Sequence, residues 1–253
     1  MANLFLKFRM CNYIIYSWIH FNLEYVNTRF LNLTDYHLAI SDGICRQLLE
    51  LNLGNKSNIY KIYNPVKLSS NVITRKKNNE FIYVGRITYE GQKDIKELID
   101  NLAHLNFNNW TLRVIGEGVD KDKCQRYLDQ KYPKLKNKVF WEGWKTNTWA
   151  SIQQADALIL TSSYEGLPMV LLEAISRGLP CLSSSIDGPN SIIQPSINGE
   201  LYKKGDKDDF SFKLSKLLKT NYDPVVMKQS ISPFYINNYI NLNFKNKLAT
   251  GLK

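Results

Sequence analysis

Short apolar runs alternate with stretches of helical periodicity along most of the chain. Ala157–Thr161 is typical of a buried strand, whereas Pro168–Arg177 repeats its apolar residues at helical spacing and is closed by Gly178. Strands that alternate with helices form parallel sheets, because each helix carries the chain back across the sheet. The pattern therefore predicts an α/β protein.

The expected elements follow this alternation. Strands are expected at Tyr13–Ile19, Tyr36–Ile40, Ile59–Tyr63, Glu80–Val84, Thr111–Ile115, Val139–Trp141, Ala157–Thr161 and Cys181–Ser184. Helices are expected near Leu23–Leu33, Ile44–Leu53, Asp122–Tyr132, Pro168–Arg177 and Asp208–Leu218, with others starting near Lys93 and Pro233. The Asn198-Gly199 pair indicates a tight turn.

The elements group into unequal parts. Residues 80–220 contain enough strands and helices for one complete doubly wound parallel-sheet domain, which is followed by a helical tail at 221–253. Residues 1–66 contain three strands, about half of such a domain, so we expect a partial N-terminal α/β domain. The polar, basic residues 67–79 have the composition of a linker. We expect the tail to pack back on the N-terminal part.

The composition excludes several classes of protein. With 44% hydrophobic and 22% charged residues over 253 positions, the chain is neither disordered, collagen-like nor a disulfide scaffold. The apolar stretch Tyr13–Leu23 is interrupted by Ser17, His20 and Asn22, so it is too short and too polar to span a bilayer. Four scattered cysteines suit a reduced, cytoplasmic compartment.

The net charge of +10 is concentrated toward the C-terminal end. Residues 203–253 contain 10 basic and 4 acidic residues. Such a segment favours phosphate groups, whether of nucleic acid, of an anionic membrane surface or of a phosphorylated substrate. A solvated, lysine-rich helix face explains the same residues equally well.

Several familiar motifs are absent. Gly116-Glu117-Gly118 lacks the third glycine of a dinucleotide fingerprint and follows the second strand of its domain, and no Walker A lysine motif occurs. The three histidines have no metal-ligand spacing with one another or with the cysteines. Asp120-Lys121-Asp122 matches the D-x-D of metal-dependent sugar transferases, but aspartates that open a helix are more often caps.

The segment Glu165–Glu173 holds two carboxylates separated by seven residues. It follows the expected strand Ala157–Thr161, and ligands bind at the carboxyl ends of strands in doubly wound sheets. Pro168 at a first helical position would leave the amides of residues 169–171 free to bind an anion. Taken alone, the two glutamates are better explained as a solvated helix residue and a helix-dipole partner.

Two cations follow the neighbouring strand. Arg86 lies just after Glu80–Val84, and Lys93 opens the next helix seven residues later. Both would converge on the same edge of the sheet, where two cations suit a diphosphate. Each of them alone is more simply a surface cation.

Together these residues resemble the donor half of a retaining, family 4 glycosyltransferase with the two-domain GT-B fold. The resemblance rests on Val84-Gly85-Arg86, Lys93, Gly116-Glu117-Gly118, Trp141-Glu142-Gly143-Trp144 and Glu165–Glu173. Within that family, Tyr83–Lys93, the Trp-Glu-Gly-Trp motif and Asn198–Tyr202 are most similar to the lipopolysaccharide core α-1,6-galactosyltransferases, which use UDP-galactose.

The resemblance implies a role for each candidate residue. Arg86 and Lys93 would bind the donor pyrophosphate. Glu173 would hold the ribose hydroxyls, and Glu165 would sit against the sugar. The remaining donor contacts would come from Gly166, Leu167, Met169 and Val170 toward sugar and phosphate, and from Gly116, Trp144 and Lys145 around the uracil. No metal or other cofactor is implied, because the cations and the helix dipole would replace it, and the departing phosphate would deprotonate the acceptor.

The N-terminal part extends the resemblance. Ser17–Phe21 resembles the strand end that presents an active-site histidine over the sugar, which makes His20 a candidate catalytic residue beside Glu165. His37 and His104 are expected to be structural. The family's N-terminal domain begins with a strand and a glycine-rich loop that do not precede Met1, so we expect a chain that lacks its amino-terminal segment.

Three hypotheses compete. The first is a UDP-galactose-dependent hexosyltransferase that acts on a glucosyl residue of the lipopolysaccharide core, in the cytoplasm and peripheral on the inner face of the cytoplasmic membrane. The second is a catalytically incompetent chain that still binds a UDP-sugar, and a transferase for glucose or N-acetylglucosamine remains open beside it. The third, a nucleic-acid-binding module, is disfavoured because aromatic and basic residues are not interleaved in a recognisable motif.

Overall fold

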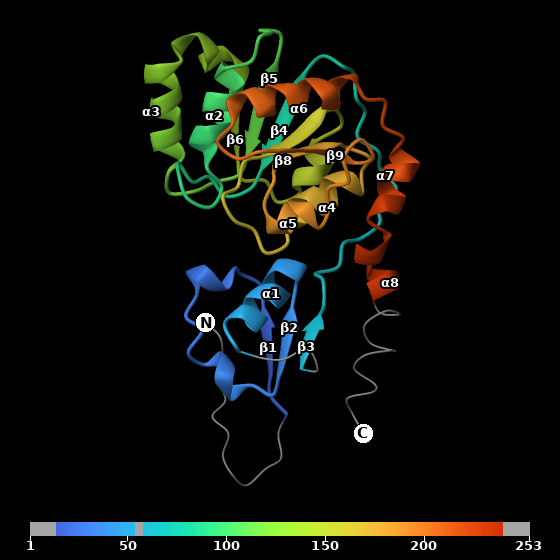
Figure 1. The fold of residues 1–253 in the computed structure, drawn as a ribbon. Helices are drawn as coiled ribbons and strands as arrows, with labels where there is room; N and C mark the ends of the chain where they lie inside the picture. Colours follow the sequence, from blue (N-terminus) through green and yellow to red (C-terminus); the bar gives the residue numbers. More distant parts are fainter. Residues whose placement is uncertain (1–13, 54–57, 240–253) are drawn as a thin grey trace.

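The computed structural model describes residues 14–53 and 58–239 of the chain. These residues form two lobes, each built on a parallel β-sheet, which lie one above the other in Figure 1. A single cluster of buried apolar side chains contains residues of both lobes, from Ile19 and Leu48 to Phe81 and Leu217. The predicted α/β class, with one complete doubly wound sheet and a partial second domain, is confirmed.

The larger lobe contains a six-stranded sheet in the order β6-β5-β4-β7-β8-β9. Its strands are β4 (Glu80–Val84), β5 (Thr111–Ile115), β6 (Val139–Gly143), β7 (Ala157–Leu160), β8 (Cys181–Ser184) and β9 (Gly199–Tyr202). All neighbouring pairs are parallel. All four residues of β7 and of β8 are buried, as expected of central strands with helices on both faces.

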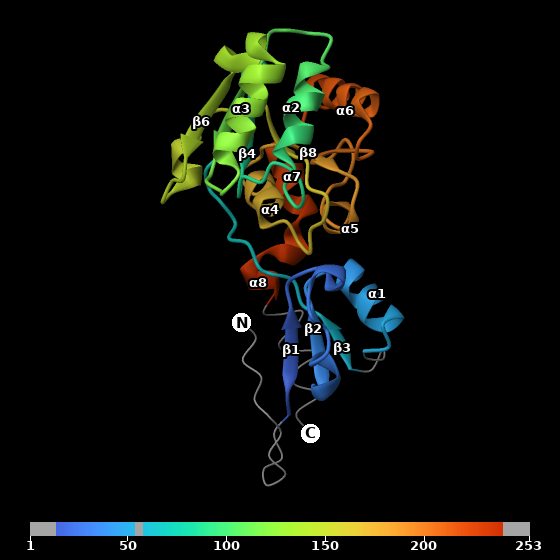
Figure 2. The same ribbon diagram turned by 90° about the vertical axis from the view of Figure 1, so that its left-hand side faces the viewer.

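Helices cover both faces of this sheet. The helices are α2 (Ile95–Ala103), α3 (Lys121–Lys131), α4 (Met169–Ile175), α5 (Asp187–Asn190), α6 (Lys207–Lys219) and α7 (Pro224–Ser230). On one face α2 contacts both α3 and α6, whereas α4 contacts α7 (Figure 2). Crossovers between parallel strands are right-handed, and the two halves of the sheet extend in opposite directions. The crossover helices α2 and α3 of the first half therefore lie on the face opposite to α4 of the second half, whereas α6 follows the last strand and packs beside α2.

The smaller lobe contains three parallel strands in the order β1-β2-β3, with bounds Tyr16–Ile19, Tyr36–Ala39 and Ile59–Lys61. Helix α1 (Asp42–Glu50) connects β2 to β3, and Ser41 caps it by accepting a hydrogen bond from the amide of Ile44. Figures 1 and 2 place α1 beside the lower end of the larger lobe, near α5.

The regular elements differ from the expectation at two places. The predicted helix Leu23–Leu33 consists of two 3₁₀ turns, Leu23–Tyr25 and Leu31–Leu33, although its apolar residues keep helical spacing. Between the turns the Asn27 side chain accepts a hydrogen bond from the amide of Arg29, a local contact that competes with a continuous helix. The turn at Asn198 leads into β9, which pairs in parallel with β8 and was not expected as a strand. Buried Asn198 ends the turn, and its side-chain oxygen accepts a hydrogen bond from the amide of Gln194.

The polar segment before β4 is fixed to the larger lobe. Ile73 is buried, and its amide donates to the carbonyl of Arg177. The Arg75 guanidinium donates to the carbonyls of Asp156 and Thr220. The fully buried Asp156 carboxylate accepts from the amides of Lys77 at 2.7 Å and Glu80 at 3.1 Å. These hydrogen bonds give the segment a defined path, unlike a freely flexible linker.

The chain returns to the smaller lobe after α7. Val66 pairs with Tyr235, and the Tyr63 and Phe234 rings lie 4.5 Å apart between centroids. A 3₁₀ turn at Ser232–Phe234 and helix α8 (Ile236–Tyr239) follow (Figure 1). The rest of the expected tail, residues 240–253, lies outside the described residues, as does Tyr13 at the start of the first expected strand.

Asp156→Asn tests how strongly the segment before β4 contributes to stability. The substitution keeps the shape but removes a buried charge that accepts two amide hydrogen bonds, and we expect a loss of about 1.5–3 kcal/mol in the free energy of unfolding. Urea denaturation measures it. Asp208→Asn is the matched control, because its side chain is 92% exposed. Equal effects of the two substitutions would show that the hydrogen bonds of the Asp156 carboxylate do not stabilise the fold.

Candidate functional site

The order of the six strands creates a crevice at the centre of the larger lobe. From β4 the chain proceeds outward through β5 and β6, then returns to β7 on the other side of β4 and proceeds through β8 and β9. The connections after β4 and β7 therefore run to opposite sides, and their loops separate at the carboxyl edge of the sheet. This is the position where a doubly wound sheet binds a ligand.

A pocket of about 380 Å³ opens between the loops that follow β4, β5 and β6. It is lined by Val84, Gly85, Arg86, Ile115, Gly116, Glu117, Trp144, Lys145 and Thr148. The structure thus brings together four of the predicted donor-binding residues, which come from three separate loops.

Glycines allow these loops to touch. A Cβ atom added to Gly116 would lie 1.9 Å from the carbonyl oxygen of Gly85, and one added to Gly118 would lie 2.0 Å from that of Ile87. The Gly116 amide also donates to the carbonyl of Gly143 at 2.9 Å. The Gly-Glu-Gly sequence thus brings the backbones after β4, β5 and β6 together and shapes the pocket.

The pocket carries positive charge and an aromatic rim. Arg86 is exposed, and within the described chain its guanidinium makes no hydrogen bond or ion pair. Lys145 pairs with Glu142, which also accepts from Nε of Arg113 at 2.5 Å. The hydrogen bond from Arg113, supported by that from Lys145, lowers the pKa of Glu142. Trp144 is 69% exposed at the edge of the pocket. A free cation beside an exposed indole suits a ligand with both a phosphate and an aromatic base.

Asp120, the expected helix cap, contacts one of these loops instead. It stands at the N-cap position of α3, but its carboxylate accepts from the amide of Tyr89 at 3.0 Å and makes no capping hydrogen bond. The D-x-D segment therefore connects α3 to the loop after β4.

Lys93 and Glu165 form a second cluster at the crevice. Lys93 precedes α2, Asp94 caps that helix, and Glu165 lies in the loop between β7 and α4. The Lys93 Nζ and Glu165 Oε1 atoms are 2.5 Å apart, and Ser162 Oγ donates to the same oxygen at 2.7 Å. Their side chains are only 15% and 7% exposed. The sequence assigned the two residues to different parts of a ligand, whereas here they bind one another.

The start of α4 differs from the expectation. Pro168 is the N-cap residue rather than the first helical residue, and its carbonyl accepts from the amide of Leu171 at 3.0 Å. One of the three amides expected to be free is therefore paired. Gly166 lies in the loop, Leu167 is buried, and Met169 and Val170 form the half-buried first turn.

Glu173, on the second turn of α4, contacts the segment that follows the pocket-lining residue Thr148. Its Oε2 atom accepts from Nε1 of Trp149 at 2.9 Å, and the Arg177 guanidinium lies 4.8 Å from the Trp149 ring centroid. Trp149 directly follows Thr148, which lines the pocket. Sequence reasoning missed Trp149, because a single tryptophan in a short 3₁₀ turn belongs to no motif.

His20 lies where the two lobes meet. A Cβ atom added to Gly166 would lie 2.6 Å from the His20 carbonyl oxygen. The imidazole contacts the side-chain amide of Asn64 at 3.4 Å, and burial lowers its pKa, which favours the neutral ring at neutral pH. An ion pair of 2.5 Å between Arg46 of α1 and Asp187 of α5 also joins the lobes.

Neither a metal-binding cluster nor a membrane-spanning helix occurs among the described residues. Residues 14–53 and 58–239 contain no group of three or more histidine, cysteine or acidic side chains placed to hold a metal ion. No helix among them combines the length and apolar character that crossing a bilayer requires.

The fold and the crevice define a glycosyltransferase of the GT-B type, in which two α/β domains face each other across the ligand. The chain belongs to the family of group 1 glycosyl transferases, whose family model matches residues 67–231.

The similar proteins give a consistent picture. The lipopolysaccharide 1,6-galactosyltransferase of Escherichia coli K12 is 40% identical over 89% of this chain, and that of Salmonella typhimurium LT2 is 38% identical over 96%. The chain spans 65% and 69% of the length of these two relatives. The structure of the apo lipopolysaccharide outer core galactosyltransferase WaaB superposes with a TM-score of 0.85 at 38% identity, covering 95% of this chain and 69% of that one. The Anabaena HepE structure in complex with UDP shares the fold, with a TM-score of 0.77 at 17% identity, and covers 94% of this chain and 72% of its own.

Gly116→Ala tests the close loop packing. The added methyl group would meet the backbone of Gly85, which no side-chain rotation can relieve. Gly91→Ala is the control, because Gly91 also has a positive φ, +83°, but no atom within 4 Å of an added Cβ. We expect Gly116→Ala to lower the free energy of unfolding by about 1–3 kcal/mol more than Gly91→Ala. Similar losses in denaturant titrations would show that the two loops can move apart to accommodate the methyl group.

Proposed function

We propose that this protein is a retaining, metal-independent galactosyltransferase that transfers galactose from UDP-galactose to a glucosyl residue of the lipopolysaccharide core. The proposal is supported by two features that follow the adjacent strands β4 and β7, the Arg86 pocket with its exposed indole and the mostly buried Lys93–Glu165 pair. The choice of galactose and of the acceptor rests on the relatives that are 38–40% identical.

The donor would extend from the pocket to the boundary between the lobes. The uracil would lie in the pocket near Trp144 and Lys145, with the ribose hydroxyls toward Glu173. The pyrophosphate would then lie between Arg86 and Lys93, in line with the positive charge there. Glu165 would contact the sugar, on the side where His20 meets Gly166.

The Lys93–Glu165 ion pair gives this site a way to exchange partners. A diphosphate competes with the carboxylate for the Lys93 ammonium, since both are anions. Binding of the donor would thereby free Glu165 Oε1, which Ser162 still orients, to accept hydrogen bonds from sugar hydroxyls.

The reaction itself would need few protein groups. Arg86 and Lys93 would stabilise the negative charge that develops on the departing diphosphate, which is the largest electrostatic change of the reaction. The acceptor hydroxyl would attack from the face that the diphosphate leaves and give its proton to the phosphate oxygen. A neutral His20 would donate or accept one hydrogen bond with the sugar without adding charge.

The acceptor suggests where the protein works. A lipopolysaccharide core carries phosphates and is anchored in a membrane, and the basic C-terminal segment would attract it and anionic lipid. We therefore propose a cytoplasmic protein, peripheral on the inner face of the cytoplasmic membrane, with no nucleic-acid partner.

Transfer from UDP-galactose to a core oligosaccharide that ends in glucose tests the proposal directly. Parallel reactions with UDP-glucose and UDP-N-acetylglucosamine distinguish a transferase for another sugar. UDP binding in calorimetry without transfer from any donor would support the catalytically incompetent alternative. Absence of UDP binding would refute both.

Arg86→Ala and Lys93→Ala should each weaken UDP binding by about 10- to 150-fold, the equivalent of one charge-assisted hydrogen bond. Uridine binding should change much less, because both cations act on phosphate. The double variant should lose less than the two effects combined, since both residues contact one ligand. Calorimetry measures all three, with Lys136→Ala, a 64% exposed lysine paired with Asp129, as the control. Equal losses for UDP and uridine would point to an unfolded domain.

Glu173→Gln should weaken UDP binding by a similar factor, about 10- to 150-fold, through loss of the charge that accepts the ribose hydroxyls. The glutamine oxygen still accepts from Trp149, so the pocket wall keeps its support. Glu90→Gln, at an exposed position paired with Lys96, is the matched control. Unchanged affinity in calorimetry would remove Glu173 from the site.

A further inference from the structure

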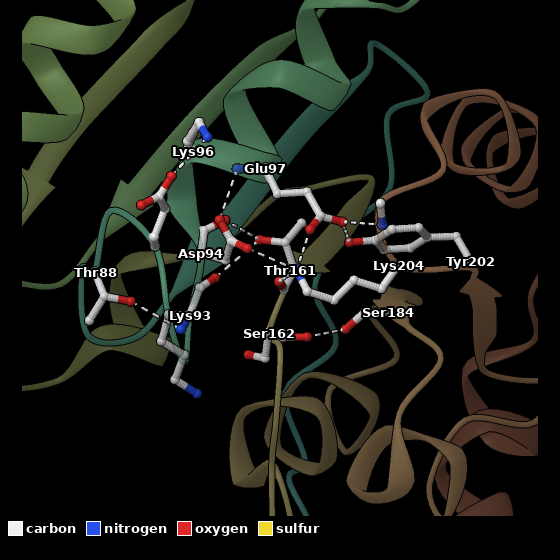
Figure 3. Close-up of polar contacts among 12 residues, drawn as sticks. Thr88, Lys93, Asp94, Lys96, Glu97, Thr161, Ser162, Ser184, Tyr202 and Lys204 are labelled. Carbon is white, nitrogen blue, oxygen red and sulfur yellow. Dashed lines mark hydrogen bonds and ion pairs between the residues drawn. The ribbon is translucent and has the colours of Figure 1, made fainter.

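Behind the Lys93–Glu165 pair lies another lysine that no motif includes. Lys204, two residues after the end of β9, extends its ammonium toward α2 and the end of β7 (Figure 3). It lies 2.9 Å from Asp94 Oδ2 and 3.2 Å from the carbonyl oxygen of Thr161, and it also pairs with Glu97. The side chains of Lys204, Asp94 and Glu97 are 24%, 17% and 13% exposed, so solvent screens these contacts only in part.

Asp94 is the direct neighbour of Lys93 and has an unusual backbone. Its φ of +48° and ψ of +60° lie in the left-handed region, which costs free energy for a residue with a Cβ atom. Its Oδ1 atom caps α2 by accepting from the amide of Glu97, while Oδ2 accepts from Lys204. The Lys204 ammonium therefore stabilises the residue whose backbone sets the direction in which Lys93 leaves the loop.

Thr161 connects the same lysine to both halves of the crevice. Its Oγ1 atom lies 3.2 Å from the carbonyl oxygen of Lys93 and 3.0 Å from that of Asp94. Its own carbonyl accepts from Lys204 (Figure 3). The next residue is Ser162, which donates to Glu165. Ser184 Oγ supports Ser162 from β8 by donating to its carbonyl at 2.6 Å.

The charges explain why a lysine is needed at this point. Asp94 and Glu97 would repel each other without a cation between them, and Glu97 cannot move away easily. Its Oε1 atom accepts from Tyr202 Oη at 2.8 Å and from the amide of Gly205 at 3.1 Å. Removal of the ammonium would therefore mainly displace Asp94, because its left-handed backbone can relax to a more favourable conformation.

We propose that Lys204 is a positioning residue of the donor site, which holds Lys93 and Glu165 in place through Asp94 and Thr161 without touching the ligand. The proposal rests on the proposed function, because it assigns Lys93 the pyrophosphate. A residue that merely stabilises the fold would affect every ligand alike. A residue that orients Lys93 affects ligands with phosphate.

The experiment compares Lys204→Met with Lys203→Met by calorimetry with UDP and with uridine. The neighbouring Lys203 side chain is 81% exposed and pairs with Asp206 at 3.9 Å, so its substitution removes the same charge without touching the network. We expect Lys204→Met to weaken UDP binding about tenfold or more, with uridine binding changed less than twofold, and Lys203→Met to change neither. Lys204→Arg, which keeps the charge, should recover part of the affinity.

A double-mutant cycle tests whether Lys204 acts on UDP binding through Lys93. In a Lys93→Ala background, Lys204→Met should cause little further loss of UDP affinity, because Lys204 acts through the missing side chain. Independent, multiplying losses would overturn the proposal, and so would unchanged UDP affinity in Lys204→Met or equal losses for UDP and uridine.

If Lys204→Met does not fold, a pair of Thr161 variants tests the proposal instead. Thr161→Val removes the hydroxyl bonded to the Lys93 and Asp94 carbonyls, whereas Thr161→Ser keeps it. We expect a selective loss of UDP binding in the valine variant and near-normal binding in the serine variant, and equal behaviour of the two overturns the proposal. If the unmodified chain does not bind UDP, the proposed function fails and this proposal fails with it. If it binds UDP and the variants bind as well, only this proposal fails.

Discussion

The parallel pairing of β4 with β7 is the constraint on which the rest of the site depends. Phe81 and Ile82 align with Ala157 and Leu158, so two strands about 75 residues apart in sequence end side by side. Because the chain leaves them in opposite directions, their loops do not cover the strand ends. The loop with Arg86 and Lys93 and the loop with Glu165 then lie at one crevice.

Two kinds of contact turn this crevice into a defined site. Glycines let the backbones after β4, β5 and β6 approach to contact distance, as the Gly116–Gly85 approach shows. Carboxylates then fix the functional cations, since Glu142 pairs with Lys145 and Glu165 pairs with Lys93. Partly buried ion pairs contribute little net stability, because desolvation offsets much of the attraction. Their value here is to hold charge in place before a ligand arrives, which lowers the cost of organising the site.

The sequence predicts the fold where local pattern and tertiary environment agree. β7 and β8 are fully buried, and their continuous apolar runs are sufficient evidence of strands. The sequence pattern does not predict β9, because Glu200 in this strand is charged and yet buried. Its burial depends on the ion pair with Lys216 of α6, a residue distant in sequence. The pattern fails again at Leu23–Leu33, where local periodicity does not determine how the chain packs.

The candidate site was likewise predictable only where a single segment of sequence carries the signal. Sequence reasoning located Arg86, Gly116, Trp144 and Lys145, which the structure gathers around one pocket. It did not predict that Lys93 binds Glu165, that Trp149 binds Glu173 or that Lys204 supports both loops. Each of these contacts joins side chains from different elements, and no spacing along one segment encodes it.

The separation of the two glutamates has a geometric meaning in this fold. Glu165 lies in the loop before α4, close to Lys93, while Glu173 is the fifth residue of the helix and contacts Trp149. Four residues of helix advance about 6 Å along its axis, and the loop before Pro168 adds the turn that brings Glu165 to the crevice. One carboxylate therefore lies beside Lys93, and the other lies beside Trp149, next to the segment that lines the pocket. A ligand that reached both would have to extend from the pocket past Lys93 to the boundary, as a sugar joined through a diphosphate to a nucleoside does. A helix that began one turn later would put Glu173 beside the loop and leave the pocket wall without its partner.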